Sequence, residues 1–145
     1  MTDMKSLLPH REPFLFVDRI EKSDKDEVVG YKRFLETEFF FPGHFPQYPV
    51  VPGVILIEAM AQCGGAGVRM MAPEGGGSSL FVLATVEKAK FRRQVRPGEE
   101  LRMVITNLRL SRAMIRQAGK GWVGDELAVE AEWLCLSGPS PSASM

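Results

Sequence analysis

The amino-acid sequence predicts an α+β fold in which an antiparallel β-sheet wraps around one long central α-helix. Three observations predict this fold class. The run from Gly53 to Met71 is apolar on nearly every face, as expected of a helix that is buried on all sides. Five or six further segments have the residue pattern of strands. The 145 residues, 45% of them hydrophobic, suffice for one domain with a single core.

Two expected strands precede the helix and four follow it. The first two are Phe14 to Ile20 and Val28 to Phe34, separated by a charged turn. The later four are Leu80 to Val86, Glu99 to Leu110, Met114 to Val123 and Leu127 to Leu136. The last strand alternates between apolar and acidic residues, so one of its faces is expected to be buried. Gly124 and Asp125 predict a hairpin turn before it.

The helix is expected to follow a loop that holds one shape. Four prolines occur between Pro42 and Gly53, and each restricts the backbone at and before its own position. Pro52 suits the first helical position, where its missing N–H would have no partner. Three glycines in the second half of the helix, Gly64, Gly65 and Gly67, predict close approach of neighbouring backbone.

The folded domain is expected to span residues 1–136. Residues 137–145 form a Ser- and Pro-rich tail with little apolar surface to bury, which is typical of disordered segments. The Gly- and Ser-rich residues 73–79 predict a flexible loop after the helix. No internal repeat divides the chain.

Charge and composition limit which kinds of partner and which cellular compartment are expected. Acidic and basic residues are equal in number, so overall charge favours neither nucleic acid nor a membrane surface. No apolar run approaches the roughly 20 residues of a membrane span, and the N-terminus lacks the apolar core of a signal peptide. Cys63 and Cys135 have no metal-type spacing, which predicts free thiols in a reducing compartment. A cytoplasmic protein is therefore expected.

Glu58 is the most informative residue, because it places a carboxyl group inside the apolar helix. An ionised carboxylate that is buried without a partner is costly, so such a group either becomes neutral or serves a purpose. A carboxyl kept protonated near neutral pH can act as a general acid. Gln62, four residues later, lies on the same helical face and can orient that carboxyl. The alternatives are an interface ion pair for Glu58 and an ordinary helix position for Gln62.

His44 is the second candidate, since it stands in the stiff segment from Pro42 to Pro46. A neutral imidazole is the side chain best suited to take a proton at neutral pH, although a lone histidine is more often structural. Gly53 offers a third component, because a helix N-terminus has unpaired N–H groups that can polarise a substrate carbonyl. A base, an acid and an oxyanion donor together describe β-elimination. No metal site is predicted, because two distant histidines and no cysteine cluster make a poor ligand set.

Basic residues outnumber acidic ones between Lys88 and Arg116. This stretch is a candidate docking surface for an acidic partner, and the alternative is a set of solvated strand faces. The candidate docking residues are Lys88, Lys90, Arg92, Arg93 and Arg96.

Several of these segments resemble the FabZ-type 3-hydroxyacyl-[acyl carrier protein] dehydratases. The resemblance is carried by Pro9-His10-Arg11 with Pro13 to Arg19, by Phe40 to Pro46, by Pro49 to Val54 with Glu58 to Gln62, and by Lys88 to Arg93 with Val95 to Glu99. It covers about Leu7 to Leu136, and its central motif is long and specific.

The resemblance implies a hot-dog fold and a homodimer with a continuous sheet, which in this family commonly assembles as a trimer of dimers. His44 of one subunit would remove the C2 proton of a 3-hydroxyacyl thioester, and Glu58 of the other would protonate the departing hydroxyl. The Gly53 N–H would bind the thioester carbonyl, with Gln62, Phe45 and Pro46 in supporting roles. The product would be a trans-2-enoyl thioester in fatty-acid biosynthesis.

The partner implied by the resemblance is an acyl carrier protein, whose phosphopantetheine carries the substrate, and no other cofactor is implied. A glutamate acid, rather than the aspartate of the dehydratase/isomerase branch, favours plain dehydration. The sequence departs from the family pattern at Glu12, at Thr85-Val86-Glu87 and at Phe81, which stands where a tyrosine often lines the tunnel mouth. The alternatives are a hot-dog acyl thioesterase and an inactive subunit that binds acyl thioesters.

Overall fold

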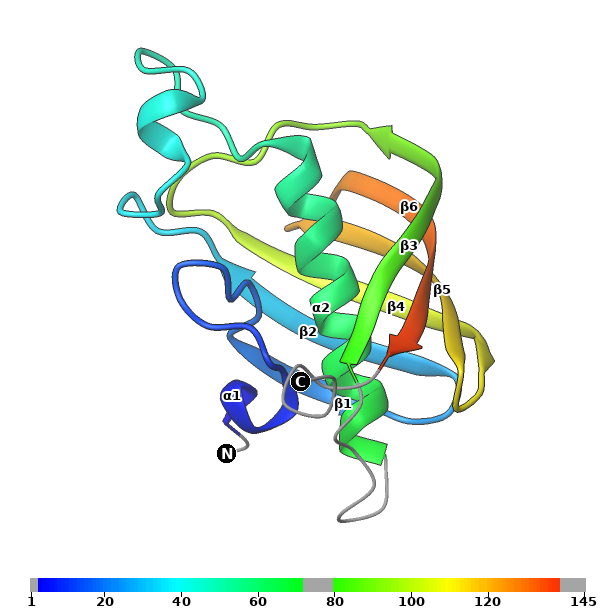
Figure 1. Cartoon of the computed structure of the whole chain (residues 1–145). Coiled ribbons are helices and arrows are strands. Elements are labelled where there is room, and N and C mark those ends of the chain that lie inside the picture. The colour runs from blue at the N-terminus through cyan, green and yellow to red at the C-terminus, as the bar shows by residue number, and fades with distance from the viewer. Residues whose placement is uncertain (1–2, 72–79, 139–145) are drawn as a thin grey trace.

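The computed structural model describes residues 3–71 and 80–138, which form a six-stranded sheet around one long helix (Figure 1). The short helix α1 (Met4–Leu7) is followed by strands β1 (Arg19–Ser23) and β2 (Glu27–Arg33). A 3-10 turn η1 (Phe41–Gly43) precedes the central helix α2 (Gly53–Met71). The remaining strands are β3 (Leu80–Phe91), β4 (Glu100–Leu110), β5 (Met114–Val123) and β6 (Glu126–Gly138).

The strand order is β1-β2-β4-β5-β6-β3, and every neighbouring pair is antiparallel. Gly124 adopts φ +57° in the turn between β5 and β6, which confirms the predicted hairpin. Strand β3 follows α2 in the chain but pairs with β6, so it forms an edge of the sheet. The sheet curves around α2, which confirms the predicted α+β class (Figure 1).

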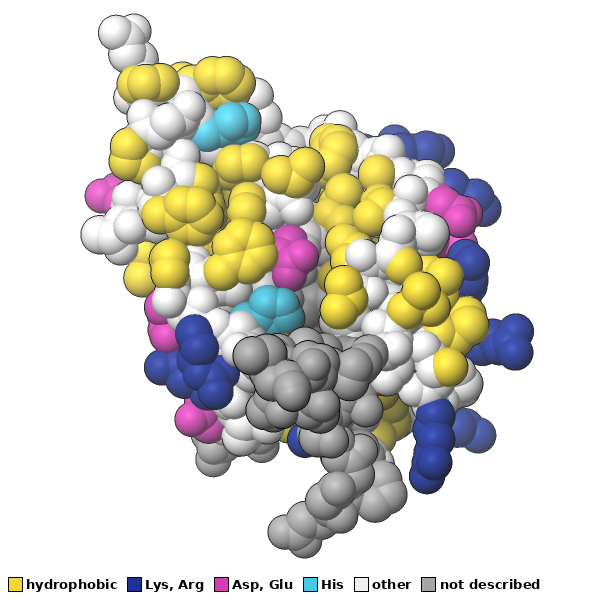
Figure 2. Space-filling view, viewed as in Figure 1, with side chains coloured by type: hydrophobic (Ala, Val, Ile, Leu, Met, Phe, Trp, Pro, Cys, Tyr) yellow, Lys and Arg dark blue, Asp and Glu magenta, His cyan; other side chains and the backbone are white. Residues whose placement is uncertain are grey.

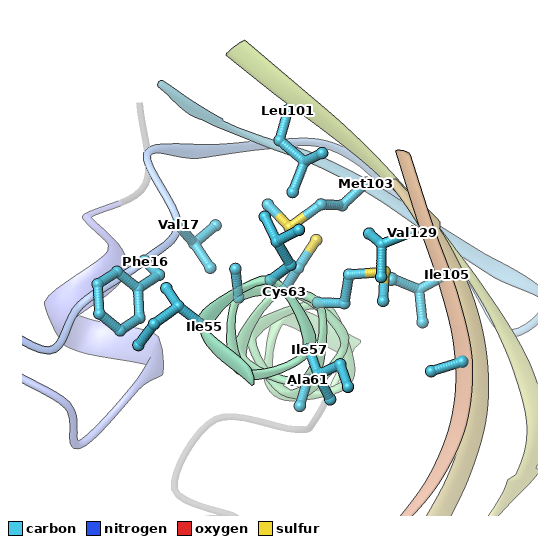
Figure 3. Packing of buried hydrophobic residues seen from close by; sticks show 14 of the residues in the cluster. Phe16, Val17, Ile55, Ile57, Ala61, Cys63, Leu101, Met103, Ile105 and Val129 are labelled. Carbon is cyan, nitrogen blue, oxygen red and sulfur yellow. The ribbon is translucent and has the colours of Figure 1, made fainter. Parts of the chain in front are cut away.

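The core lies between α2 and the concave face of the sheet. Figure 3 shows Cys63 of the helix facing Met103 of the sheet, with Val129 and Ile105 further along the sheet. Gly67 packs against the side chain of Val28 so closely that an added Cβ would collide with it. The expectation that the helix glycines allow close packing is therefore confirmed at this position.

The first predicted strand is wrong over most of its length, because β1 begins only at Arg19. In the preceding loop, the Phe16 N–H donates to Gln62 Oε1 at 2.8 Å, and the Phe14 carbonyl accepts from Gln62 Nε2 at 3.1 Å. The backbone is therefore satisfied by a helix side chain rather than by a neighbouring strand. Local residue pattern cannot reveal this long-range partner.

Two later boundaries also differ from the sequence prediction. Strand β3 continues beyond Val86 to Phe91, since it stays paired with β6 as far as Val129. Strand β6 continues to Gly138, where it pairs with Leu80, so the domain extends beyond the expected limit at residue 136. Pro52 lies just before α2 rather than at its first position. The predicted loop at 73–79 and most of the predicted tail lie outside the described residues.

Helix α2 also corrects the sequence prediction that no apolar run approaches the length of a membrane span. The helix has 19 residues, and an 18-residue window of it has a mean hydropathy of 1.2, so it is long and apolar enough to cross a bilayer by length and composition alone. However, 61% of the relevant window is buried inside the protein. A helix that is apolar on all faces is equally typical of a protein core, and the sheet covers α2 in that way.

Candidate active site

His44 follows the 3-10 turn η1 and is held in the loop by hydrogen bonds of its backbone and its ring. Its N–H donates to the Phe41 carbonyl at 3.2 Å, and its carbonyl accepts from the Val50 N–H at 3.1 Å. Its ring Nδ1 lies 3.0 Å from the Val50 carbonyl oxygen. A carbonyl can only accept, so Nδ1 carries the proton and Nε2 keeps its lone pair. The loop thus presents His44 in the tautomer that a general base requires.

A second set of contacts fixes this loop against the strand that follows. The Val51 N–H donates to the Val95 carbonyl at 2.8 Å. The guanidinium of Arg96 donates to the Pro49 carbonyl at 2.9 Å and lies 3.9 Å from the centroid of the Tyr48 ring. The predicted single shape of the loop therefore rests on these tertiary contacts as well as on its prolines.

His44 and Gly53 line one hollow, whose volume is about 540 Å³. Phe45 lines it too, with its ring centroid 4.4 Å from that of His44, whereas Pro46 is exposed and does not line it. The Gly53 N–H, at the start of α2, has no hydrogen-bond acceptor within the described residues. A Cβ at Gly53 would lie 2.7 Å from the Phe91 ring, so a larger residue there would have to displace that exposed ring. The hollow therefore combines a base with an unused N–H donor.

Glu58 lies on another side of α2, where Gln62 holds it. Gln62 Nε2 donates to Glu58 Oε2 at 2.9 Å and also to the Phe14 carbonyl, while its Oε1 accepts from the Phe16 N–H. The predicted pairing of Glu58 with Gln62 is therefore present. Gln62 is only 2% exposed, whereas the Glu58 side chain is 22% exposed. The carboxyl thus stands at the wall of a hollow rather than deep in the core.

The hollow beside Glu58 has a volume of about 380 Å³ and a mainly apolar lining. Figure 2 shows this side of the molecule, where one acidic side chain lies among hydrophobic ones and beside a histidine. Phe81 is part of the lining, as is Cys135. Burial, and to a lesser degree the charge of Glu58, raises the pKa of the Cys135 thiol to about 11. This cysteine is therefore an uncharged wall residue near neutral pH and not an activated nucleophile.

A single chain does not bring the two candidate catalytic residues into one hollow. Among residues 3–71 and 80–138, none lines both the hollow of His44 and that of Glu58. Each hollow holds half of the chemistry expected for β-elimination, the base and N–H donor in one and the acid in the other.

The five candidate docking residues divide into two groups. Arg93 donates to both carboxylate oxygens of Glu99, at 2.9 and 2.7 Å, which lowers the pKa of that carboxyl. Arg93 and Arg96 therefore both stabilise the loops around His44.

The other three docking candidates, Lys88, Lys90 and Arg92, are exposed on β3 or directly after it. Lys88 Nζ lies 3.1 Å from a carboxylate oxygen of Glu132, and Arg92 Nε lies 2.6 Å from one of Glu130. Such exposed pairs cost little to break, so these side chains remain available to a partner.

His10 is the residue near the candidate acid that sequence reasoning left without a role. Its Nε2 lies 3.5 Å from Glu58 Oε2, and it lines the hollow beside Glu58. The only signal for it in the sequence is the motif Pro9-His10-Arg11, which carries no local chemical pattern. Within residues 3–71 and 80–138, no group of three or more His, Cys, Asp or Glu side chains gathers as a metal site would require.

Solved structures with the same fold include both dehydratases and thioesterases. The dehydratase heterocomplex ApeI:P from Xenorhabdus doucetiae matches with a TM-score of 0.81 and 16% identity, covering 98% of this chain and 94% of that one. A hypothetical thioesterase with coenzyme A from Streptococcus pneumoniae matches with a TM-score of 0.60 and 11% identity, over 84% and 89%. At such identities the likeness shows the fold alone, and the predicted hot-dog fold is confirmed.

Sequence comparison is more specific. The family model of the FabA-like domain matches residues 8–132. A 3-hydroxyacyl-[acyl-carrier-protein] dehydratase FabZ from Desulforamulus reducens is 47% identical over 93% of this chain and 94% of its own length. A FabZ from Koribacter versatilis is 42% identical over 98% of this chain and 91% of its own length. The chain belongs to the FabA-like domain family and, within it, to the FabZ-type 3-hydroxyacyl-[acyl-carrier-protein] dehydratases.

Proposed function

We propose that this protein dehydrates 3-hydroxyacyl-[acyl carrier protein] to trans-2-enoyl-[acyl carrier protein] in fatty-acid biosynthesis, with His44 as base and Glu58 as acid. The observation that carries these roles is the hydrogen bond from His44 Nδ1 to the Val50 carbonyl, because it leaves Nε2 free to take a proton. The hydrogen bond from Gln62 to Glu58 supports the second role, since it orients the carboxyl at the wall of an apolar hollow.

The proposed chemistry uses each component once. The Gly53 N–H binds the thioester carbonyl and stabilises the negative charge that develops on its oxygen. His44 Nε2 removes the proton from C2, and those electrons form the C2–C3 double bond as the C3–O bond breaks. Glu58 gives its proton to the departing hydroxyl, which leaves as water. The cycle then needs His44 to lose a proton and Glu58 to regain one.

The working form is a homodimer in which His44 of one copy faces Glu58 of the other. Two observations support this arrangement. The two residues line separate hollows in one chain, and the edge strand β3 exposes the apolar side chains Val82 and Val86, which are 58% and 41% accessible. A long apolar edge is a template for pairing with another strand. Pairing across a two-fold axis would give a continuous sheet and two equivalent sites, and three such dimers would form the larger assembly.

The substrate arrives on the phosphopantetheine of an acyl carrier protein in the cytoplasm, and no further cofactor takes part. The apolar hollow beside Glu58 would receive the acyl chain. Lys88, Lys90 and Arg92 would attract the acidic carrier. Their placement supports this, since Arg92 also lines the hollow of His44, where the thioester would enter.

The deciding experiment is to incubate the purified protein with a 3-hydroxyacyl-[acyl carrier protein] and to follow enoyl product and free thiol in parallel. We expect enoyl thioester without release of thiol. Release of thiol without enoyl product would make the protein a thioesterase, and binding without turnover would make it an inactive acyl-binding subunit. Either result would overturn the proposed function.

A further inference from the structure

His10 contacts the carboxyl group of Glu58 from a loop that is itself fixed. Arg11 Nη1 donates to the carbonyls of Leu8 and His10, at 2.9 and 2.7 Å, and so holds the backbone on both sides of the imidazole. From this loop, His10 Nε2 reaches within 3.5 Å of Glu58 Oε2. Contacts of this kind are often long without substrate and tighten in the complex.

The surroundings of the His10 ring determine which nitrogen carries the proton. Its Nδ1 is buried and has no hydrogen-bond partner among the described residues. An N–H buried there would be left unsatisfied, which costs more than leaving a bare ring nitrogen without a donor. Of the two neutral tautomers, the surroundings therefore favour the one with its proton on Nε2, which faces Glu58.

Two donors then converge on the same oxygen of Glu58. Gln62 Nε2 donates to Oε2 at 2.9 Å, and His10 Nε2 lies 3.5 Å from that atom. The carbonyl oxygen of a carboxylic acid accepts hydrogen bonds far better than its hydroxyl oxygen does. In the protonated acid, Oε2 is therefore the carbonyl oxygen and Oε1 carries the proton.

We propose that His10 is a positioning residue which, together with Gln62, holds Oε2 of Glu58 so that Oε1 carries the proton delivered to the leaving hydroxyl. The inference rests on the proposed role of Glu58 as the acid. It requires a neutral N–H donor at the place of Nε2, and it requires neither a positive charge nor a proton at Nδ1.

The test compares His10→Gln with His10→Asn in the purified enzyme. The amide nitrogen of glutamine reaches about as far as histidine Nε2, whereas that of asparagine reaches about as far as Nδ1. We expect His10→Asn to lower kcat about 10-fold with KM changed less than about 2-fold, as would His10→Ala. His10→Gln is expected to stay within about 3-fold of the wild type. Leu7→Ala, which lies in the same hollow without a polar group, is the control for altered packing and is expected to change KM rather than kcat.

A second comparison separates this inference from the proposed function. If His10 acts through Glu58, His10→Asn added to Glu58→Gln should cause no further loss of kcat. Equal kcat in His10→Asn and His10→Gln would overturn the inference, as would a full further loss in the double variant. A Glu58→Gln variant with normal turnover would instead overturn the proposed role of Glu58 itself. Thermal unfolding of each variant shows whether a loss of kcat comes from loss of fold.

Discussion

Two loops of this protein each present one imidazole, and they differ in which ring nitrogen has a partner. In the loop before α2, His44 Nδ1 donates to the Val50 carbonyl, so Nε2 is bare. In the loop before β1, His10 Nδ1 is buried without a partner among the described residues, so Nε2 carries the proton and faces Glu58. One side chain is thus prepared to take a proton and the other to donate a hydrogen bond. The position of an acceptor in the backbone, and not the residue type, decides between the two roles.

The loops also differ in how they are anchored. The loop of His44 is fixed mainly by backbone contacts and by Arg96. The loop of His10 is fixed by side chains, by Arg11 next to His10 and by Gln62 further along at Phe14 and Phe16. Gln62 therefore both holds the N-terminal loop and orients Glu58. A substitution at Gln62 should therefore impair protonation by Glu58, and a substitution at Arg96 should impair proton removal by His44.

The largest effect is expected from removing the two catalytic groups. His44→Ala and Glu58→Gln should each lower kcat by about 1000-fold, the middle of the range of about 100- to 10,000-fold that proton transfer by a positioned group contributes. Steady-state kinetics with an acyl carrier protein substrate measures the loss. Both variants should unfold at nearly the wild-type temperature, since neither side chain belongs to the packed core. Normal turnover in either variant would remove that residue from the mechanism.

Mixing these two inactive variants tests whether the site spans two copies. A dimer with one chain of each kind contains one complete site, formed by His44 of the Glu58→Gln chain and Glu58 of the His44→Ala chain. After subunit exchange, the mixture should regain about a quarter of wild-type activity, because about half of the dimers are mixed and each has one of two sites intact. No recovery, once exchange has been verified by mass spectrometry, would place both residues in the same chain.

The next largest effect is expected from Gln62→Leu. The change frees the Glu58 carboxyl and leaves the Phe16 N–H and the Phe14 carbonyl unsatisfied. We expect kcat to fall about 100-fold and the free energy of unfolding to drop by about 2–6 kcal/mol, at about 1–3 kcal/mol for each of the two unsatisfied groups.

Gln117→Leu is the matched control for Gln62→Leu. Gln117 is also a fully buried glutamine with several hydrogen bonds, but its partners are Gly64, Asn107 and Trp133 rather than Glu58. Chemical denaturation should show a similar loss of stability, while kcat per folded molecule stays near the wild-type value. An equal loss of kcat in both variants would mean that Gln62 acts through stability alone.

A smaller effect is expected from Arg96→Ala, which loosens the loop of His44. The variant loses the hydrogen bond to the Pro49 carbonyl and the contact with the Tyr48 ring. We expect kcat to fall about 10-fold through poorer placement of the base. The loss should be the same with a carrier-bound substrate and with a small acyl thioester. Arg102→Ala, whose guanidinium also lies over an aromatic ring, serves as the control outside both hollows.

The smallest effect is expected from Lys88→Glu and Lys90→Glu. These variants test docking of the acyl carrier protein and leave the loops of His44 and His10 unchanged. KM for the carrier-bound substrate should rise about 5-fold at low salt, with the difference shrinking as salt screens the charges. KM for a small acyl thioester should not change. Lys25→Glu, an exposed lysine in the turn between β1 and β2, controls for the change in net charge. A rise in KM with both substrates would mean that the variants disturb the site instead.

The sequence by itself determined the elements with strong local patterns and the types of residue that carry the chemistry. The apolar run of α2, the alternation along β6 and the Gly-Asp turn before it are each encoded within a few neighbouring residues. Glu58 and Gln62 could be paired because four residues bring side chains to the same face of a helix. The motif around His44 identified the family, although the spacing alone left its role open.

Only the tertiary structure decided the features that depend on partners far apart in the chain. It decided that Phe14 and Phe16 bond to Gln62 rather than to a neighbouring strand, that Val50 assigns the tautomer of His44, and that His10 meets Glu58. The physical reason is the same in each case. A hydrogen bond takes whatever acceptor the fold brings within about 3 Å, and no local pattern of residues records which acceptor that will be.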